Sequence, residues 1–165
     1  MTYYDSTTID NLYNHNLSLA IQSLLKLDVF CGQSPKISGL NGWVFEQTIQ
    51  FCLRKELEAI GIQTAFYEQH QLEGKVKVDL LVKHLAIEIK SRGIFGKSEA
   101  SKYLEYRITA QQLGLKYLYL TRSENYAPYR IAMIEAIGHD DTFFLDRQDD
   151  WDRFVMRVAK ELNEN

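Results

Sequence analysis

Apolar residues in the first third of the chain recur every three or four positions, which is the spacing of one face of an α-helix. The first such segment runs from about Thr8 to Lys26, and the segment after it, Gly32 to Asn41, contains a proline and glycines that predict a loop. A second helix is expected to begin near Gly42, with Asn41 as its cap and Gly61 as its stop. Its inner face is predicted to consist of Phe45, Ile49, Cys52, Leu53, Leu57 and Ile60.

The pattern then changes to alternating apolar and polar positions, which are typical of half-buried strands. Strands are expected at Ile62 to Glu68, Val76 to Val82, Leu85 to Ser91 and Lys116 to Thr121. A helix capped by Ser98 is expected to run to Gly114, between the last two strands. The remaining patterns predict a helix at Pro128 to Ile137, a short strand at Thr142 to Leu145 and a terminal amphipathic helix at Asp150 to Leu162. This order predicts an α/β fold in which helices flank a mixed central sheet.

Length and composition predict a single domain. The chain has 165 residues and is 45% hydrophobic, which is sufficient for one buried core. Within that domain we expect an N-terminal helical extension (1–40), a core (42–121) and a C-terminal part with a helix and a short strand (122–165). The two cysteines, Cys31 and Cys52, lack the spacing of a zinc site or a disulfide framework, so a reducing cytoplasm is expected. No apolar run approaches the ~20 residues of a membrane span, and no secretory segment is expected.

The stretch from Lys75 to Lys90 carries the most informative polar residues. If its two strands turn symmetrically about Lys83 and His84, Asp79 lies directly opposite Glu88, and the side chains sort onto two faces. The apolar face is predicted to contain Val76, Val78, Leu80, Val82, Leu85, Ile87 and Ile89. The other face is predicted to present Lys77, Asp79, Glu88 and Lys90.

Two opposed carboxylates are unfavourable unless a positive charge lies between them. A divalent cation would meet that need, because Mg²⁺ binds one or two carboxylates together with water and phosphate oxygens. Lys90, on the same face as Asp79 and Glu88, could orient or activate an attacking water, or stabilise charge on a phosphate. The alternative is an ordinary polar surface with diagonal Asp79–Lys90 and Lys77–Glu88 ion pairs. That alternative also places Lys77 opposite Lys90, which is a second like-charge pair.

These residues resemble the PD-(D/E)XK nuclease superfamily over roughly Gly42 to Thr121. Glu88-Ile89-Lys90 matches the family's Glu-Xaa-Lys, and Val78-Asp79 resembles its Pro-Asp, with valine in place of proline. Phe45-Glu46 resembles the helix that carries an additional acidic ligand. The resemblance implies a restriction-endonuclease-like core in the order αβββαβ and Mg²⁺-dependent hydrolysis of DNA phosphodiester bonds, with Mn²⁺ able to substitute.

The same resemblance implies which residues form the active site. Asp79, Glu88 and Glu46, together with the Ile89 carbonyl, would hold metal, and Lys90 would assist the attacking water. Glu46 borders the inner face of its helix, so a solvated helix residue is an equally good interpretation of its position.

Basic residues are concentrated around this stretch although the whole chain has a net charge of -3. From Lys75 to Arg107 there are eight basic and four acidic residues, a patch that could meet a phosphate backbone or be an ordinary solvated surface. Arg92 and Lys97 lie in a loop with two glycines and are candidate DNA contacts; an ordinary connection with solvated charges is the alternative. Tyr103, Arg107 and Gln111 recur every four residues on the next helix and form a polar stripe, from which Arg107 and Gln111 are further candidates.

We therefore expect a cytoplasmic, Mg²⁺-dependent deoxyribonuclease, specifically an endonuclease. With one site per chain, cutting both strands of a duplex would most simply require a homodimer. One alternative is a non-catalytic DNA-binding or regulatory module that keeps the nuclease fold. Another is a structural partner that docks through the apolar face of the first helix, which would be favoured if that helix failed to pack on its own core.

Overall fold

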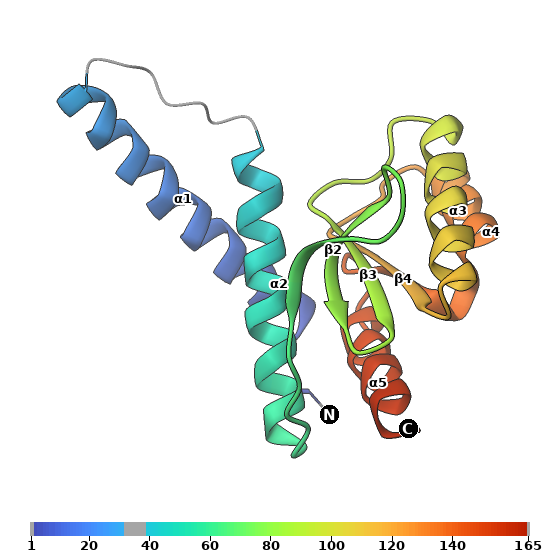
Figure 1. Ribbon diagram of the computed structural model, residues 1–165. Helices are drawn as coiled ribbons and strands as arrows, with labels where there is room; N and C mark the ends of the chain where they lie inside the picture. The colour runs from blue at the N-terminus through green and yellow to red at the C-terminus, as the bar shows by residue number, and fades with distance from the viewer. Residues whose placement is uncertain (1, 32–38, 165) are drawn as a thin grey trace.

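The protein forms a five-stranded mixed β-sheet with helices on both faces (Figure 1). The computed structural model describes residues 2–31 and 39–164, so only the last part of the loop expected from Gly32 to Asn41 lies within it. The elements are α1 (Ser6–Cys31), α2 (Leu40–Ala59), β1 (Tyr67–Gln71), β2 (Lys77–Val82), β3 (Leu85–Lys90), α3 (Lys97–Gln112), β4 (Lys116–Thr121), α4 (Ala127–Ile137), η1 (His139–Asp141), β5 (Thr142–Phe144) and α5 (Asp150–Asn163). None of the helices in the described ranges combines the length and apolar character of a membrane span.

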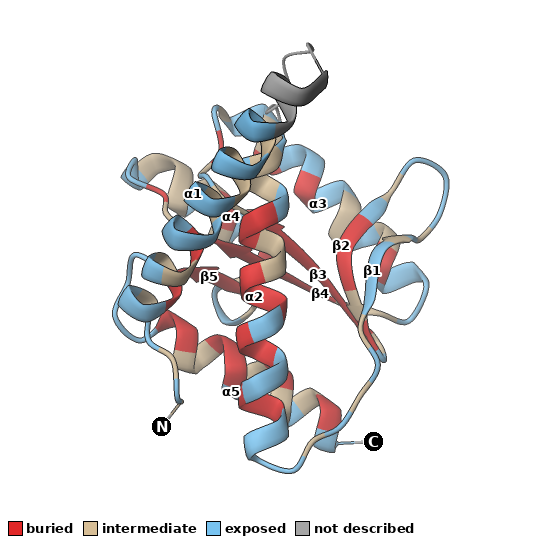
Figure 2. Ribbon diagram, turned by 90° about the vertical axis from the view of Figure 1, so that its left-hand side faces the viewer, coloured by how far each residue is buried: buried red, intermediate tan, exposed pale blue. Residues whose placement is uncertain are grey.

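The strands follow chain order across the sheet, β1-β2-β3-β4-β5. β1, β2 and β3 pair antiparallel, whereas β4 pairs parallel with both β3 and β5. Parallel neighbours require a long crossover connection, and α3 and α4 supply these two crossovers. Both helices lie on one face of the sheet, while α2 and α5 cover the other (Figures 1 and 2).

Two apolar clusters join these layers. The first lies between the sheet and the helices α1, α2 and α5, and the second lies between the sheet and the helices α3 and α4. The predicted inner face of α2 is confirmed for five residues, which are fully or almost fully buried: Phe45, Ile49, Cys52, Leu53 and Leu57. Ile60 was predicted wrongly and is 58% exposed, because α2 ends at Ala59 and the chain turns away from the core there.

Helix α1 packs on the core through its N-terminal half. Ile9 and Tyr13 are buried in the first cluster, and the Tyr13 ring contacts the Phe45 ring edge to face at 5.4 Å. The C-terminal half of α1 extends away from the sheet (Figure 1). α1 therefore packs on the core of its own chain, whereas the alternative of a docking helix would have been favoured by a helix that does not.

The helix caps differ from those expected. α2 begins at Leu40, so Asn41 lies inside the helix and Gly39, with φ 88°, precedes it. α3 begins at Lys97, so Ser98 lies inside it, and the Phe95 N–H instead donates to Glu99 Oε2 at 2.9 Å. The predicted stop at Gly61 is confirmed.

The first strand lies further along the chain than the alternation predicted. Residues 62–66 alternate between half-buried and exposed positions, but they form an irregular connection rather than a strand. The position of β1 depends on its pairing with β2. A tight turn at 72–76, in which the Leu72 N–H donates to the Val76 carbonyl, joins the two strands, so their pairing begins at Gln71 and Lys77. An alternating pattern reports burial on one face, and pairing requires a neighbouring strand as well.

Candidate active site

The β2–β3 hairpin has the predicted register. Leu80 pairs with Ile87 and Val82 with Leu85, so the turn consists of Lys83 and His84 as expected. Lys83 adopts a left-handed backbone conformation with φ 51°, as two-residue hairpin turns require. The pairing continues as far as Leu80 and Ile87, which leaves Asp79 at the point where the ladder stops.

The Asp79 side chain takes over a backbone hydrogen bond at this point. Its Oδ2 accepts the Ile89 N–H at 2.8 Å, so a carboxylate occupies the place of a strand carbonyl. The same oxygen accepts Lys90 Nζ at 2.9 Å, and Oδ1 accepts Gln69 Nε2 at 3.1 Å. Three donors from two strands therefore fix the orientation of one carboxylate.

The regular alternation of faces is lost beside Asp79, which corrects one prediction. Leu80, Val82, Ile87 and Ile89 belong to the first apolar cluster as expected. Val78 instead packs in the second cluster with Ala86. Because Asp79 bonds sideways to β3, the residues before it no longer follow the pleat of the paired part of the strand.

Lys90 lies between the two carboxylates. Its Nζ is 2.6 Å from Glu88 Oε1 and 2.9 Å from Asp79 Oδ2. Burial by itself would lower the pKa of Lys90, but the Glu88 and Asp79 carboxylates outweigh it and hold that pKa above its usual value. Lys90 thus remains a cation and supplies the positive charge that the opposed carboxylates need.

Glu88 is buried on the face of the sheet that α3 and α4 cover. It is 3% exposed, and burial raises its pKa to about 7, partly offset by the charge of Lys90. Among the described residues, its Oε2 has no hydrogen-bond partner, and neither has the hydroxyl of nearby Tyr117. An unpaired buried carboxylate oxygen is costly, so this atom is available to a cation or a water.

Glu46 reaches the group through an intermediate residue. Gln69 Nε2 donates to Glu46 Oε2 at 2.9 Å and also bonds Asp79, which links helix α2 to strands β1 and β2. Burial and the Asp79 charge raise the pKa of Glu46 to about 7. Sequence reasoning missed Gln69, because the strand that carries it was expected to end at Glu68.

The donor groups are of the kind that Mg²⁺ prefers. In the described ranges no group of three or more His, Cys, Asp or Glu side chains is arranged to hold a metal ion. Asp79 and Glu88 nevertheless offer two carboxylates, one with an unpaired oxygen. The Ile89 N–H points toward Asp79 on β2, whereas the Lys90 C=O accepts a bond on the other side from the N–H of Arg122, the residue after β4. Because successive carbonyls of a strand point in opposite directions, the Ile89 carbonyl faces the Asp79 side. Mg²⁺ needs only one or two carboxylates when water and phosphate supply its other ligands.

Two of the four candidate DNA contacts, Arg92 and Lys97, follow closely in the chain after Lys90. Arg92 and Lys97 are exposed in the segment that leaves β3 directly after Lys90. Arg107 donates to the Ala136 carbonyl at 3.0 Å, which ties α3 to the end of α4. Gln111 is exposed at the last turn of α3, near the start of β4 and at the opposite end of the sheet from Lys90.

The loop that carries Arg92 is held in place by hydrogen bonds, and a steric requirement explains why residue 93 is glycine. Glu124 Oε2 accepts the Ile94 N–H at 2.8 Å, and Thr121 Oγ1 donates to the Arg92 carbonyl at 2.8 Å. A Cβ on Gly93 would overlap the Glu124 carboxylate. Gly93 therefore permits a close approach between two loops.

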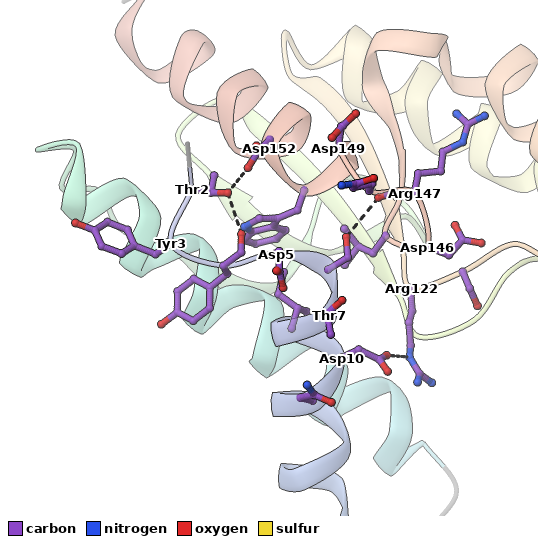
Figure 3. Close-up of a pocket in the computed structure, with 18 of the residues that line it drawn as sticks. Thr2, Tyr3, Asp5, Thr7, Asp10, Arg122, Asp146, Arg147, Asp149 and Asp152 are labelled. Carbon is purple, nitrogen blue, oxygen red and sulfur yellow. Dashed lines mark hydrogen bonds and ion pairs between the residues drawn. The ribbon is translucent and has the colours of Figure 1, made fainter.

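A groove of about 950 Å³ lies between the N-terminal segment, the start of α1 and the loops after β4 and β5 (Figure 3). Its charged lining is predominantly acidic, with Asp5, Asp10, Asp146, Asp149 and Asp152 against Arg122 and Arg147. Arg122 is already paired with Asp10 at 2.5 Å. This groove is poorly suited to a phosphate backbone, and Asp79, Glu88 and Lys90 do not line it.

Comparisons with protein-family models, with curated proteins and with solved structures gave no match. A functional assignment therefore depends on the geometry of the chain itself.

Proposed function

We propose that this chain is a metal-dependent nuclease that hydrolyses phosphodiester bonds in DNA, most simply as an endonuclease. The observation that carries the proposal is the convergence of Asp79, Glu88 and Lys90, with one ammonium within 2.9 Å of both carboxylates. The element order α2-β1-β2-β3-α3-β4 supports a restriction-endonuclease-like core, because it is the order implied by the resemblance to the PD-(D/E)XK superfamily.

Asp79, Glu88 and the Ile89 carbonyl are the groups that would hold Mg²⁺ or Mn²⁺, with Glu46 beside them. When bound, the cation supplies Lewis acidity and positive charge at the phosphate. The Ile89 N–H keeps the Asp79 carboxylate in one orientation, so little reorganisation is needed.

Lys90 acts as a donor in this proposal. Its raised pKa keeps it protonated, so it is unsuited to removing a proton from water. It can orient the attacking water or donate hydrogen bonds to the phosphate oxygens. In the reaction, a water loses a proton as its oxygen forms a bond to phosphorus, the bond from phosphorus to the leaving sugar oxygen breaks, and that oxygen gains a proton, so that one water is consumed for each bond cleaved.

Exposed cations at the same end of the sheet support a nucleic-acid substrate. Lys77 begins β2 two residues before Asp79, Arg92 follows Lys90 by two residues, and Lys97 and Lys102 lie on the first two turns of α3. Cations so placed can contact phosphates on either side of the scissile bond, with an affinity that falls as salt rises.

Cleavage of supercoiled plasmid and of branched DNA with Mg²⁺ or Mn²⁺ tests the proposal. Asp79→Asn and Lys90→Met should each reduce metal-dependent cleavage by about 10²-fold or more, as expected for loss of an electrostatic group in the transition state. Lys75→Ala is the control, because Lys75 is exposed in the β1–β2 turn. Intact substrates after incubation with folded, metal-supplied wild type would refute the proposal.

One observation favours a second candidate, a non-catalytic DNA-binding or regulatory module. Lys90 already pairs with both carboxylates, so part of their negative charge is offset without a metal ion. Such a module would bind DNA equally well in EDTA and in Mg²⁺, and its melting temperature (Tm) would not respond to Mn²⁺. Binding a cation only in the folded state would instead raise the Tm.

A further inference from the structure

Gln69 has a backbone conformation that strands rarely contain. Its φ is 48°, in the left-handed region, although it lies in the middle of β1. The neighbouring pairs, Glu68 with Leu80 and His70 with Val78, place Gln69 opposite Asp79. A left-handed backbone conformation is unfavourable for residues other than glycine, and it persists only where the surroundings hold it.

The side-chain amide of Gln69 is shared between two carboxylates. Nε2 donates to Glu46 Oε2 at 2.9 Å and to Asp79 Oδ1 at 3.1 Å. Both oxygens bond the same nitrogen, so they lie within about 6 Å of each other. Two carboxylates this close repel each other, and the two N–H dipoles of the amide offset this repulsion.

Building on the proposed nuclease function, we propose that Gln69 is a positioning residue that holds Glu46 beside Asp79, so that Glu46 joins the cation-binding group. Glu46 comes from α2 and Asp79 from β2, and the Gln69 amide hydrogen-bonds to both. The left-handed backbone is retained because this conformation lets the amide reach both carboxylates. A residue with no such task would relax to ordinary strand geometry.

Titration with Mn²⁺, followed by the electron paramagnetic resonance signal of the free ion, tests this inference on the intact chain. Gln69→Leu and Gln69→Gly should each raise the Mn²⁺ dissociation constant by about 10-fold or more, as losses of groups that orient metal ligands do. Gln71→Leu is the matched control, because Gln71 lies on the same strand and its side chain donates to the Gly74 and Val76 carbonyls of the β1–β2 turn. Gln69→Gly should keep or raise the Tm, since glycine adopts φ 48° freely, and this separates weakened binding from unfolding.

A double-mutant cycle identifies the group through which Gln69 acts. In a Glu46→Gln background, Gln69→Leu should change Mn²⁺ affinity by less than 2-fold, because the carboxylate that Gln69 positions is already gone. Unchanged affinity in both Gln69 variants, or an equal loss in the Glu46→Gln background, would overturn the inference while leaving the nuclease proposal standing. A wild type that neither binds Mn²⁺ nor cuts DNA would overturn both.

Discussion

Burial sets the proton affinity of Glu88. Because its folded pKa is about 7, against 4.5 for the free side chain, the folded state holds a proton between these values that the unfolded state releases. Protonation of Glu88 therefore stabilises the folded state, and this contribution to the free energy of unfolding is fully present below about pH 4.5 and declines as the pH rises through 7.

Glu88→Gln should remove this dependence. Glutamine has the shape of protonated glutamate and cannot ionise, so the Tm of the variant relative to wild type should rise between pH 5 and pH 8. The corresponding free energy is at most about 3 kcal/mol. Thermal unfolding in EDTA measures it, with Glu105→Gln, an exposed glutamate on α3, as control. An offset that stays the same at both pH values would show that Glu88 titrates normally.

Gly93 and Gly96 lie in one loop but differ in how much space surrounds the position of a Cβ atom. Gly93→Ala should lower the free energy of unfolding by about 1–3 kcal/mol, because the new Cβ meets the Glu124 carboxylate. Gly96→Ala should be nearly neutral, since its φ is -177° and its nearest neighbour, Ser98 Oγ, is 3.8 Å away. Urea unfolding compares the two variants; equal losses would contradict the steric explanation.

At the scale of elements, sequence reasoning succeeded where an element carries a strong apolar pattern of its own. The β2–β3 hairpin was predicted with its register, because alternation and a two-residue turn determine each other. β4 was predicted residue for residue, and α4, β5 and α5 to within a residue. β1 was misplaced because its exposed, polar residues 67–71 contain little apolar signal and its position depends on β2. The same error concealed Gln69, the one site residue that no motif marked.

The placement of α3 separates two basic residues that the sequence treated alike. Arg107→Ala should lower the Tm, since it removes the bond to the end of α4, and should leave DNA affinity unchanged. Lys97→Ala should leave the Tm unchanged and weaken DNA binding, with a shallower salt dependence, because Lys97 is exposed beside the proposed site. Fluorescence anisotropy with labelled duplex DNA, in a salt series without divalent metal, measures the affinities. A larger loss of affinity in Arg107→Ala would reverse the assignment.

At the scale of the whole molecule, charge differs between two neighbouring regions of the surface. Lys77, Arg92, Lys97 and Lys102 are exposed at the start of β2 and in the segment that follows β3, whereas the groove that includes Arg122 is lined mainly by acidic side chains. The net charge of -3 therefore conceals a local excess of basic residues, which we propose contacts one DNA strand. If each chain has one such site, cleavage of both strands requires either that one chain binds the duplex twice or that two chains act on it together.

If the proposed nuclease acts as a homodimer, we expect it to cut both strands together. Supercoiled plasmid should then become linear without accumulation of nicked circles, and light scattering should give twice the chain mass of 19.2 kDa. A chain that remains monomeric at cleavage concentrations and yields nicked circles first would contradict this expectation.

The hydrogen bond from the Ile89 amide to Asp79 has a practical consequence for spectroscopy. One backbone amide in the centre of the sheet has a side-chain carboxylate as its acceptor, where its neighbours have carbonyls. A cation that draws electron density from the carboxylate weakens that bond and moves the amide resonance, while neighbouring amides keep theirs. The Ile89 signal in a nitrogen–proton correlation spectrum should thus report occupancy of the proposed cation site, and it can be followed with no substrate present.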